Sequence, residues 1–230
     1  MKKQIIIKYF ILLALVQFTG CMSSGEDEGV LKYQIEYDEE EKKNNSVISL
    51  LPNTMSYYFK DGSSKSMMSF IGFFLAAYIS NSETKENTIL FKLMNEKYYC
   101  STKHGEPTIG FDEFPNMVLE ETKETKEIMG LKAKKVHVTF KDNSLAPFDL
   151  FYTTDLNVEN PNWNNPYRDI KGVPLDFRVK LMGISMHITL REVKFEEVKF
   201  EEFSIPEGYN KTTPEELYKT IKGILQNSGK

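Results

Sequence analysis

The feature that most constrains the fold of this chain is a succession of short segments in which apolar and polar residues alternate. Residues 30–37 (VLKYQIEY) alternate cleanly, and residues 132–140 and 185–193 follow the same pattern. A period of two places one face of a β-strand on a core and the other face in water. Further strands are predicted at residues 55–60, 88–94, 97–101, 117–122, 148–153 and 174–182. No long amphipathic segment separates these strands, which favours an antiparallel sandwich or barrel over βαβ units.

Turn residues and one helix signal complete this pattern. Asp61-Gly62 is a strong hairpin turn, and Gly183 separates two predicted strands as a hairpin turn would. Near the C-terminus, Thr213-Pro214-Glu215-Glu216 is a capping box with proline at the first helical position. Apolar residues then recur on one helical face at Leu217, Ile221, Ile224 and Leu225. We therefore expect a helix over residues 214–226 that packs on the sheet and closes one edge.

The N-terminal segment has the form of a secretory signal peptide. Met1-Lys2-Lys3 is a short cationic region, and residues 11–16 form an apolar core that is too short for a bilayer span of about 20 residues. Phe18-Thr19-Gly20-Cys21 resembles a bacterial lipobox, with Phe18 at the position where Leu is usual. The resemblance implies that residues 1–20 are removed and that Cys21 is lipidated, with palmitate among its acyl chains. The alternative is a signal peptide that merely ends in a cysteine.

Residues 21–29 carry several acids and are predicted to form a flexible tether between the lipid and the domain. Several buried acyl chains anchor a protein far better than one chain does. The acids also resemble a signal that sends some Bacteroidota-type lipoproteins to the cell surface. We therefore expect an outer-membrane lipoprotein, on the periplasmic face or at the cell surface, with a single domain over residues 30–230.

Composition excludes several functional classes. The chain has 33 acidic and 29 basic residues, and beyond its first eight residues no basic block indicates nucleic-acid binding. Lipidation of Cys21 would leave Cys100 unpaired, as a small core residue. The histidines are scattered at His104, His137 and His187. Without a ligand-spaced pair, a phosphate-binding loop or a nucleophile elbow, the sequence predicts no metal, no cofactor and no enzymatic activity.

Residues 70–79 (FIGFFLAAYI) are the most apolar stretch after the signal peptide, and Met67-Met68 precede them. Such a run is typical of a strand buried on both faces or of a core helix. It is also consistent with the lining of an apolar cavity inside a curved sheet, where methionines suit a pliable wall. On the second interpretation, the ligand-lining residues are Met67, Phe70, Phe73, Phe74 and Tyr78.

Several turn motifs resemble an uncharacterised family of Bacteroidota-type lipoproteins with a fold like that of the LolA and LppX carriers. The motifs lie in residues 121–140, 151–155, 161–167 and 170–175, with the closing Ile205-Pro206-Glu207-Gly208-Tyr209. The chain also looks distantly related to proteins named for a Gly-Leu-Pro-Gly-Leu-Ile motif, whose place residues 171–175 would take. The resemblance covers about residues 30–209 and implies an antiparallel half-barrel around a hydrophobic interior. It implies no catalytic residues.

Two functions follow as hypotheses. In the first, the lipid-anchored protein binds or carries a lipid or acyl chain in its curved sheet. In the second, the same fold has a filled core, and the protein is structural or binds an envelope protein through an exposed edge or through Trp163. Trp163 lies in a loop rich in Pro and Asn, where it could instead cover one end of the sheet.

Overall fold

The computed structural model describes residues 25–70, 72–103, 106, 114, 116–141, 145–162 and 165–227. Within these residues, twelve strands form one sheet in the order β12-β6-β5-β4-β3-β2-β1-β11-β10-β9-β8-β7. The strands are β1 (Glu28–Tyr37), β2 (Thr54–Lys60), β3 (Ser63–Phe70), β4 (Phe74–Asn81), β5 (Glu86–Leu93), β6 (Glu96–Lys103), β7 (Met117–Ile128), β8 (Leu131–Phe140), β9 (Phe148–Thr153), β10 (Val173–Leu181), β11 (Ile184–Lys194) and β12 (Asn210–Lys211). The helices are α2 (Glu39–Asn44), η1 (Ser46–Leu50), η2 (Phe200–Phe203) and α3 (Pro214–Asn227).

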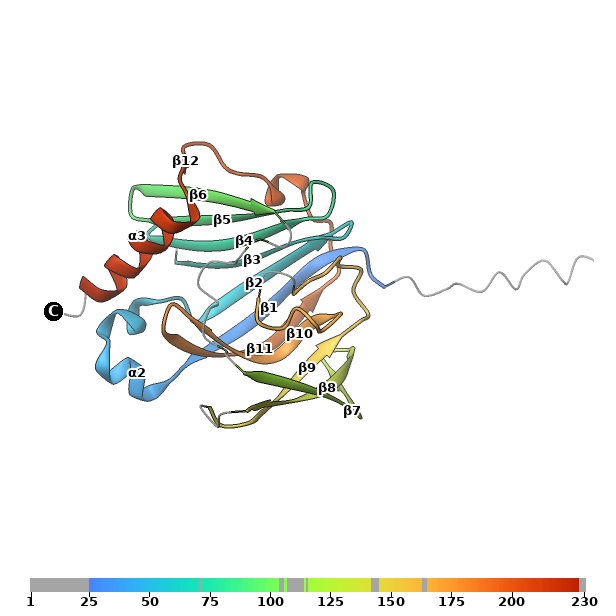
Figure 1. The fold of residues 1–230 in the computed structure, drawn as a ribbon. Coiled ribbons are helices and arrows are strands. Elements are labelled where there is room, and N and C mark those ends of the chain that lie inside the picture. The colour runs from blue at the N-terminus through green and yellow to red at the C-terminus, as the bar shows by residue number, and fades with distance from the viewer. Residues whose placement is uncertain are drawn as a thin grey trace, which may run out of the picture.

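The sheet is antiparallel and strongly curved (Figure 1). All neighbouring strands run antiparallel except β12, which pairs in parallel with β6 through Asn210 and Lys211. Strand β1 lies in the middle of the strand order, with β2 to β6 on one side and β11 to β7 on the other. The predicted fold class, a curved antiparallel sheet with a C-terminal helix, is confirmed.

Tight hairpin turns connect many of the strands. At the β2–β3 turn, Asp61 and Gly62 have φ angles of 48° and 80°, and at the β10–β11 turn Met182 and Gly183 have φ angles of 52° and 85°. Two successive positive φ angles define the turn whose twist matches that of paired strands. The predicted turns at Asp61-Gly62 and Gly183 are confirmed.

The apolar run at residues 70–79 is neither one buried strand nor a helix. Gly72, with φ 78°, lies in the turn that joins β3 to β4, so the run starts at a hairpin tip and continues into β4. The sequence interpretation failed because the residues at this tip are as apolar as those of the strand that follows. Gly72, the third residue of the run, was the signal for the turn.

Helix α3 begins with the predicted capping box. The Thr213 hydroxyl accepts a hydrogen bond from the Glu216 backbone N–H at 3.2 Å, and the Glu216 carboxylate accepts one from the Thr213 backbone N–H at 3.2 Å. Leu217 is buried beside Phe91 and Cys100, so the apolar face of the helix packs on β5 and β6. No helix among the described residues is long and apolar enough to cross a membrane.

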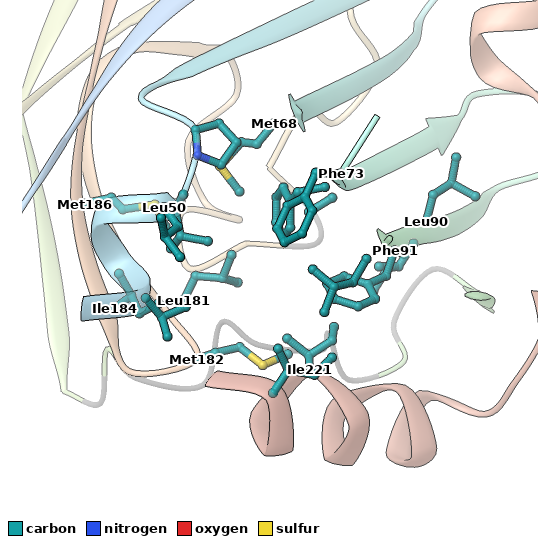
Figure 2. A pocket seen from close by; sticks show the side chains of 18 of the residues that line it. Leu50, Met68, Phe73, Leu90, Phe91, Leu181, Met182, Ile184, Met186 and Ile221 are labelled. Atoms are coloured by element: carbon teal, nitrogen blue, oxygen red, sulfur yellow. The ribbon is translucent and has the colours of Figure 1, made fainter. Parts of the chain in front are cut away.

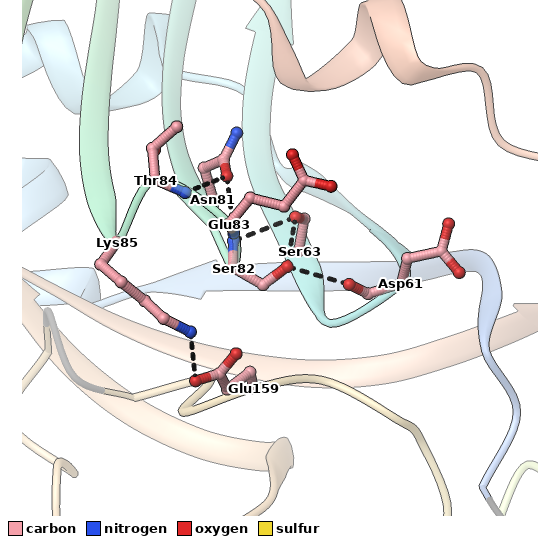
Figure 3. A network of polar contacts seen from close by, with 8 residues as sticks. All are labelled: Asp61, Ser63, Asn81, Ser82, Glu83, Thr84, Lys85 and Glu159. Atoms are coloured by element: carbon pink, nitrogen blue, oxygen red, sulfur yellow. Dashed lines mark hydrogen bonds and ion pairs between the residues drawn. The ribbon is translucent and has the colours of Figure 1, made fainter.

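One end of the curved sheet is tied together by a crossing segment, residues 154–162, which follows β9. Val158 forms a bridge with Gly62, and the Glu159 backbone N–H donates to the Gly62 carbonyl at 2.9 Å. The Glu159 carboxylate also pairs with Lys85 at 2.5 Å, and Ser82 and Ser63 link the neighbouring turns (Figure 3). These contacts join the β2–β3 and β4–β5 turns to a segment from the other half of the sheet.

The acidic residues 26–28, predicted as part of a flexible tether, belong to this end of the domain. Glu26 forms a bridge with Leu156, and Glu28 lies in β1. The Glu28 carboxylate accepts hydrogen bonds from Lys60 and from the Val198 backbone N–H. The Glu28 carboxylate is therefore fixed by a basic side chain and a backbone donor, and the strand that begins the sheet starts before the predicted residue 30.

Candidate functional site

The concave side of the sheet contains an apolar cavity, which we call chamber 1, with a volume of about 210 Å³ (Figure 2). It lies between strands β3 to β5, η1, the β10–β11 hairpin and α3. Its lining comprises Tyr37, Val47, Leu50, Leu51, Pro52, Met68, Phe73, Phe74, Ala76, Tyr78, Ile89, Leu90, Phe91, Leu93, Met94, Leu181, Met182, Ile184, Met186, Ile221 and Ile224. These described residues include no charged side chain.

A second cavity, chamber 2, adjoins the first and has a volume of about 100 Å³. The two chambers share Met68, Ala76, Tyr78, Leu181 and Met186. The rest of the chamber 2 lining is Tyr33, Met55, Tyr57, Ser64, Ser66, Met67, Ser80, Pro161, Asn162, Asn165, Val173, Pro174, Phe177, Val179 and Ile188. The combined volume of the two chambers lies at the lower end of the range of volumes of ligand pockets, roughly 300–1,000 Å³. Chamber 2 adds hydroxyl and amide groups but again no charge.

Local contacts bring η1 to the wall of chamber 1. The Asp38 side chain caps α2 by accepting from the Glu40 and Glu41 backbone N–H groups at 2.9 and 3.0 Å. The Glu41 carboxylate then accepts hydrogen bonds from the backbone N–H and the hydroxyl of Ser185, at 2.6 and 2.7 Å. This clamp holds α2 against the start of β11. It thereby positions the following η1 residues beside the β10–β11 hairpin.

The structure distributes the five predicted lining residues over different places. Phe73, Phe74 and Tyr78 line chamber 1, and Tyr78 also borders chamber 2. Met67 borders chamber 2 but packs in a cluster with Ala77, Ile79 and Leu90. Because successive strand residues point to opposite faces, this cluster lies on the face opposite Tyr78.

Phe70 does not belong to either chamber. Its side chain is 61% exposed at the tip of the β3–β4 hairpin. The prediction placed it in the lining because it treated residues 70–79 as one continuous element. At a hairpin tip, the alternation between the two faces of the sheet no longer determines where a side chain lies.

Sequence reasoning missed most of the other lining residues. Leu50 is the last residue of η1, and Leu51 follows it. Leu181, Met182 and Ile184 belong to the β10–β11 hairpin. Ile221 and Ile224 lie on the apolar face predicted for the C-terminal helix, which was the one available signal for their position. The other lining residues are brought to the chamber by packing between segments that are far apart in the sequence.

Exposed apolar side chains gather at one end of chamber 1. Leu50, Phe70 and Met94 are 67%, 61% and 59% exposed. With the partly exposed Phe73 they form what we call the apolar rim. The Met94 backbone N–H donates to the Phe73 carbonyl at 2.7 Å, which links the tips of two hairpins. The rim lies at the opposite end of the strands from the start of β1 and the crossing segment.

Titratable groups near the chambers stay neutral. Burial raises the pKa of the Tyr78 hydroxyl above its usual range. Burial also raises the pKa of the Cys100 thiol to about 11. Both groups are therefore protonated at neutral pH.

The described residues contain no cluster of His, Cys, Asp and Glu that could hold a metal ion. His137 contacts Asp149 at 2.9 Å, and His187 contacts Asp176 at 2.7 Å. Each pair joins neighbouring strands, β8 with β9 or β10 with β11. Cys21, His104 and Trp163 lie outside the described residues.

Comparison with known proteins adds little to this geometry. No family model and no curated protein matches the chain. Among solved structures, it is similar to LprF from Mycobacterium bovis, with 12% identity, a TM-score of 0.29 and coverage of 80% of this chain and 91% of that one. It is also similar to the LolA superfamily protein NE2245 from Nitrosomonas europaea, with 10% identity, a TM-score of 0.22 and coverage of 78% and 91%. Both scores are low, so the fold and the proposals below rest on the geometry of this chain alone.

Proposed function

We propose that the protein is a lipid-anchored protein of the cell envelope that binds or carries a hydrophobic ligand, a lipid or an acyl chain, inside its curved sheet. The observation that carries this proposal is the pair of adjoining chambers lined without a charged side chain. Apolar surface that a ligand removes from water contributes roughly 25 cal/mol per Å². A hydrocarbon chain is therefore the ligand that this lining favours.

The proposed anchor is lipidated Cys21, in the outer membrane, on the periplasmic face or at the cell surface. Its support is the lipobox-like sequence and the position of residue 25, from which the described chain leads into β1. The apolar rim lies at the far end of the strands. An anchored domain could thus hold the rim away from the membrane in which Cys21 is embedded.

Binding of a neutral fluorescent probe, N-phenylnaphthylamine, tests the ligand proposal. The sheet, its cores and α3 all lie within residues 25–227, so a fragment of residues 25–230 contains every described packing contact. We expect this domain to bind the probe and the Ala76→Phe variant to lose binding, because Ala76 lies where the two chambers meet. Thr220→Phe adds the same ring at an exposed position of α3 and should leave binding unchanged.

A protein with a filled core that acts only through a partner gives a different result in this experiment. Its domain would not take up the probe, and Ala76→Phe would change stability without changing fluorescence. The apolar rim is the surface that such a partner would contact, since it gathers three largely exposed apolar side chains. Loss of a captured partner in a Phe70→Ser, Met94→Ser variant that still binds no probe would favour this second function.

A further inference from the structure

Tyr57, in β2, has a buried hydroxyl without a hydrogen bond. Its side chain is 8% exposed and lines chamber 2. Within the described part of the chain, its Oη is the one buried side-chain nitrogen or oxygen that lacks a partner. Unmade hydrogen bonds of buried polar groups are costly, so most such groups in folded proteins are satisfied. A ligand bound in chamber 2 is therefore the candidate hydrogen-bond partner of this hydroxyl.

Two nearby tyrosines show the usual arrangement. Tyr33, which also lines chamber 2, donates its hydroxyl hydrogen to the Pro174 carbonyl at 2.9 Å. Tyr37, which lines chamber 1, donates to the Pro52 carbonyl. Both hydroxyls are thus held by the backbone, whereas the Tyr57 hydroxyl has no backbone acceptor. The Ser64 side chain is near enough to lower the Tyr57 pKa slightly, but the two hydroxyls do not meet in hydrogen-bond geometry. The difference separates a structural tyrosine from one that is available to a ligand.

The surroundings of Tyr57 select the chemistry of that ligand group. Ser64, Ser66 and Ser80 border the same chamber, and no described lining residue is charged. Burial raises the pKa of Tyr57 above its usual range, so the hydroxyl remains protonated and acts as a donor at neutral pH. A carboxylate or phosphate would be buried without a counter-charge, which costs far more than burying a neutral carbonyl.

We propose that Tyr57 Oη donates a hydrogen bond to an uncharged carbonyl of the ligand, and that the ligand class is neutral acyl esters such as acylglycerols. The hydrocarbon chain would occupy chamber 1 and the ester group chamber 2. This inference rests on the proposed function and adds to it the chemical class of the ligand. It also assigns Tyr57 as the residue that distinguishes an ester from a plain hydrocarbon.

The test compares two probes that differ in one carbonyl. Monolauroylglycerol and dodecylglycerol ether have the same chain length and the same glycerol group, but only the first has an ester. Each probe competes with N-phenylnaphthylamine on the domain of residues 25–230. We expect about tenfold tighter binding of the ester than of the ether, which corresponds to one well-formed buried hydrogen bond. Laurate at neutral pH should bind more weakly than the ester.

Tyr57→Phe should abolish the preference for the ester and leave the affinity of the ether unchanged. Tyr33→Phe is the matched control, because it removes a hydroxyl from the same chamber that is already bonded to the backbone. This control should keep the preference for the ester but lower the unfolding temperature of the free domain. Tyr57→Phe should leave that temperature unchanged or raise it, since it removes an unpartnered group.

Four results would overturn the inference. They are equal binding of ester and ether by the wild-type domain, a preserved preference in Tyr57→Phe, tighter binding of laurate than of the ester, or a fall in the unfolding temperature of Tyr57→Phe equal to that of Tyr33→Phe. The last result would mean that the hydroxyl is already bonded in the free protein. If neither glycerol probe nor N-phenylnaphthylamine binds, the proposed function fails as well, and that outcome is distinct from binding without discrimination.

Discussion

At Gly172 the backbone before β10 lies directly against β9. A Cβ added to this glycine would be 2.4 Å from the Thr153 carbonyl oxygen and 2.5 Å from the Tyr152 ring. The buried Asn162 side chain holds the same turn by donating to the Ile170 and Gly172 carbonyls at 2.8 and 2.7 Å. Close approach of the two strands, and not a positive φ angle, is therefore the reason for a glycine at this position.

Gly172→Ala should therefore lower the free energy of unfolding by about 2 kcal/mol, the usual cost of forcing an extra carbon into a packed site. Urea denaturation measures this loss. The matched control is Gly223→Ala in α3, where an added Cβ meets nothing within 4 Å. That variant should gain roughly 0.5–1 kcal/mol, because alanine loses less conformational entropy in a helix than glycine does. Equal effects at the two glycines would contradict the close-approach explanation.

Cys100 gives a second prediction at the residue scale. The thiolate is the nucleophilic form of cysteine, and burial raises the pKa of this thiol to about 11. The folded state therefore keeps the proton more tightly than the unfolded state does, up to that pH. We expect iodoacetamide to modify Cys100 very slowly at pH 8 and faster as the pH rises toward 11. Rapid modification of the folded domain at pH 8 would show that the thiol is accessible.

Helix α3 protects this thiol at the scale of elements. Leu217 is 1% exposed and packs in one cluster with Cys100, Ile89 and Phe91. Leu217→Ala should loosen this contact and increase the rate of Cys100 modification under native conditions, because deleting buried carbons leaves a cavity. Mass spectrometry of the iodoacetamide adduct over time measures the rate. Thr220→Ala, on the exposed side of the helix, should leave the rate unchanged.

The capping box of α3 is a further element that a single substitution tests. Thr213→Ala removes the hydroxyl that accepts from the Glu216 backbone N–H, which should lower the free energy of unfolding by about 1 kcal/mol. Thermal unfolding followed by circular dichroism measures this change. A Thr220→Ala variant is again the control. No difference between the two variants would mean that the helix end contributes nothing to stability.

Much of the element pattern could be predicted from the sequence. Alternation revealed segments of β1, β8 and β11, and the capping box revealed α3, because each is a local signal. Strand β3 was missed because its sequence, SSKSMMSF, has serines where a half-buried strand usually has apolar residues. Helix α2 was missed because it buries no side chain and has only its Asp38 cap and acidic first turn as signals.

The cavity itself could be predicted only in part. Residues 70–79 suggested an apolar wall, and three of the five proposed residues line chamber 1. The opposing wall comes from η1, the β10–β11 hairpin and α3, which are far apart in the sequence. Their meeting depends on long-range contacts such as the pair of hydrogen bonds between Ser185 and Glu41. Tyr57 gave no sequence signal, since an unpartnered hydroxyl is a property of packing.

At the scale of the whole molecule, the two ends of the curved sheet differ in character. The end where β1 begins is tied by polar contacts, including the Lys85–Glu159 pair (Figure 3). The other end exposes the apolar rim beside chamber 1. The end where β1 begins also exposes Phe195 and Phe200, but among the described residues these two line neither chamber.

Native mass spectrometry tests ligand binding most sharply, on the domain of residues 25–230 exported to the periplasm behind a cleavable signal peptide and purified without detergent. We expect a bound species that organic solvent extracts and whose mass matches a neutral acyl lipid. We expect the Ala76→Phe variant, purified in the same way, to be empty. A wild-type domain that carries nothing and takes up no added lipid would contradict binding of an acyl lipid in the chambers, as would the same adduct in both proteins.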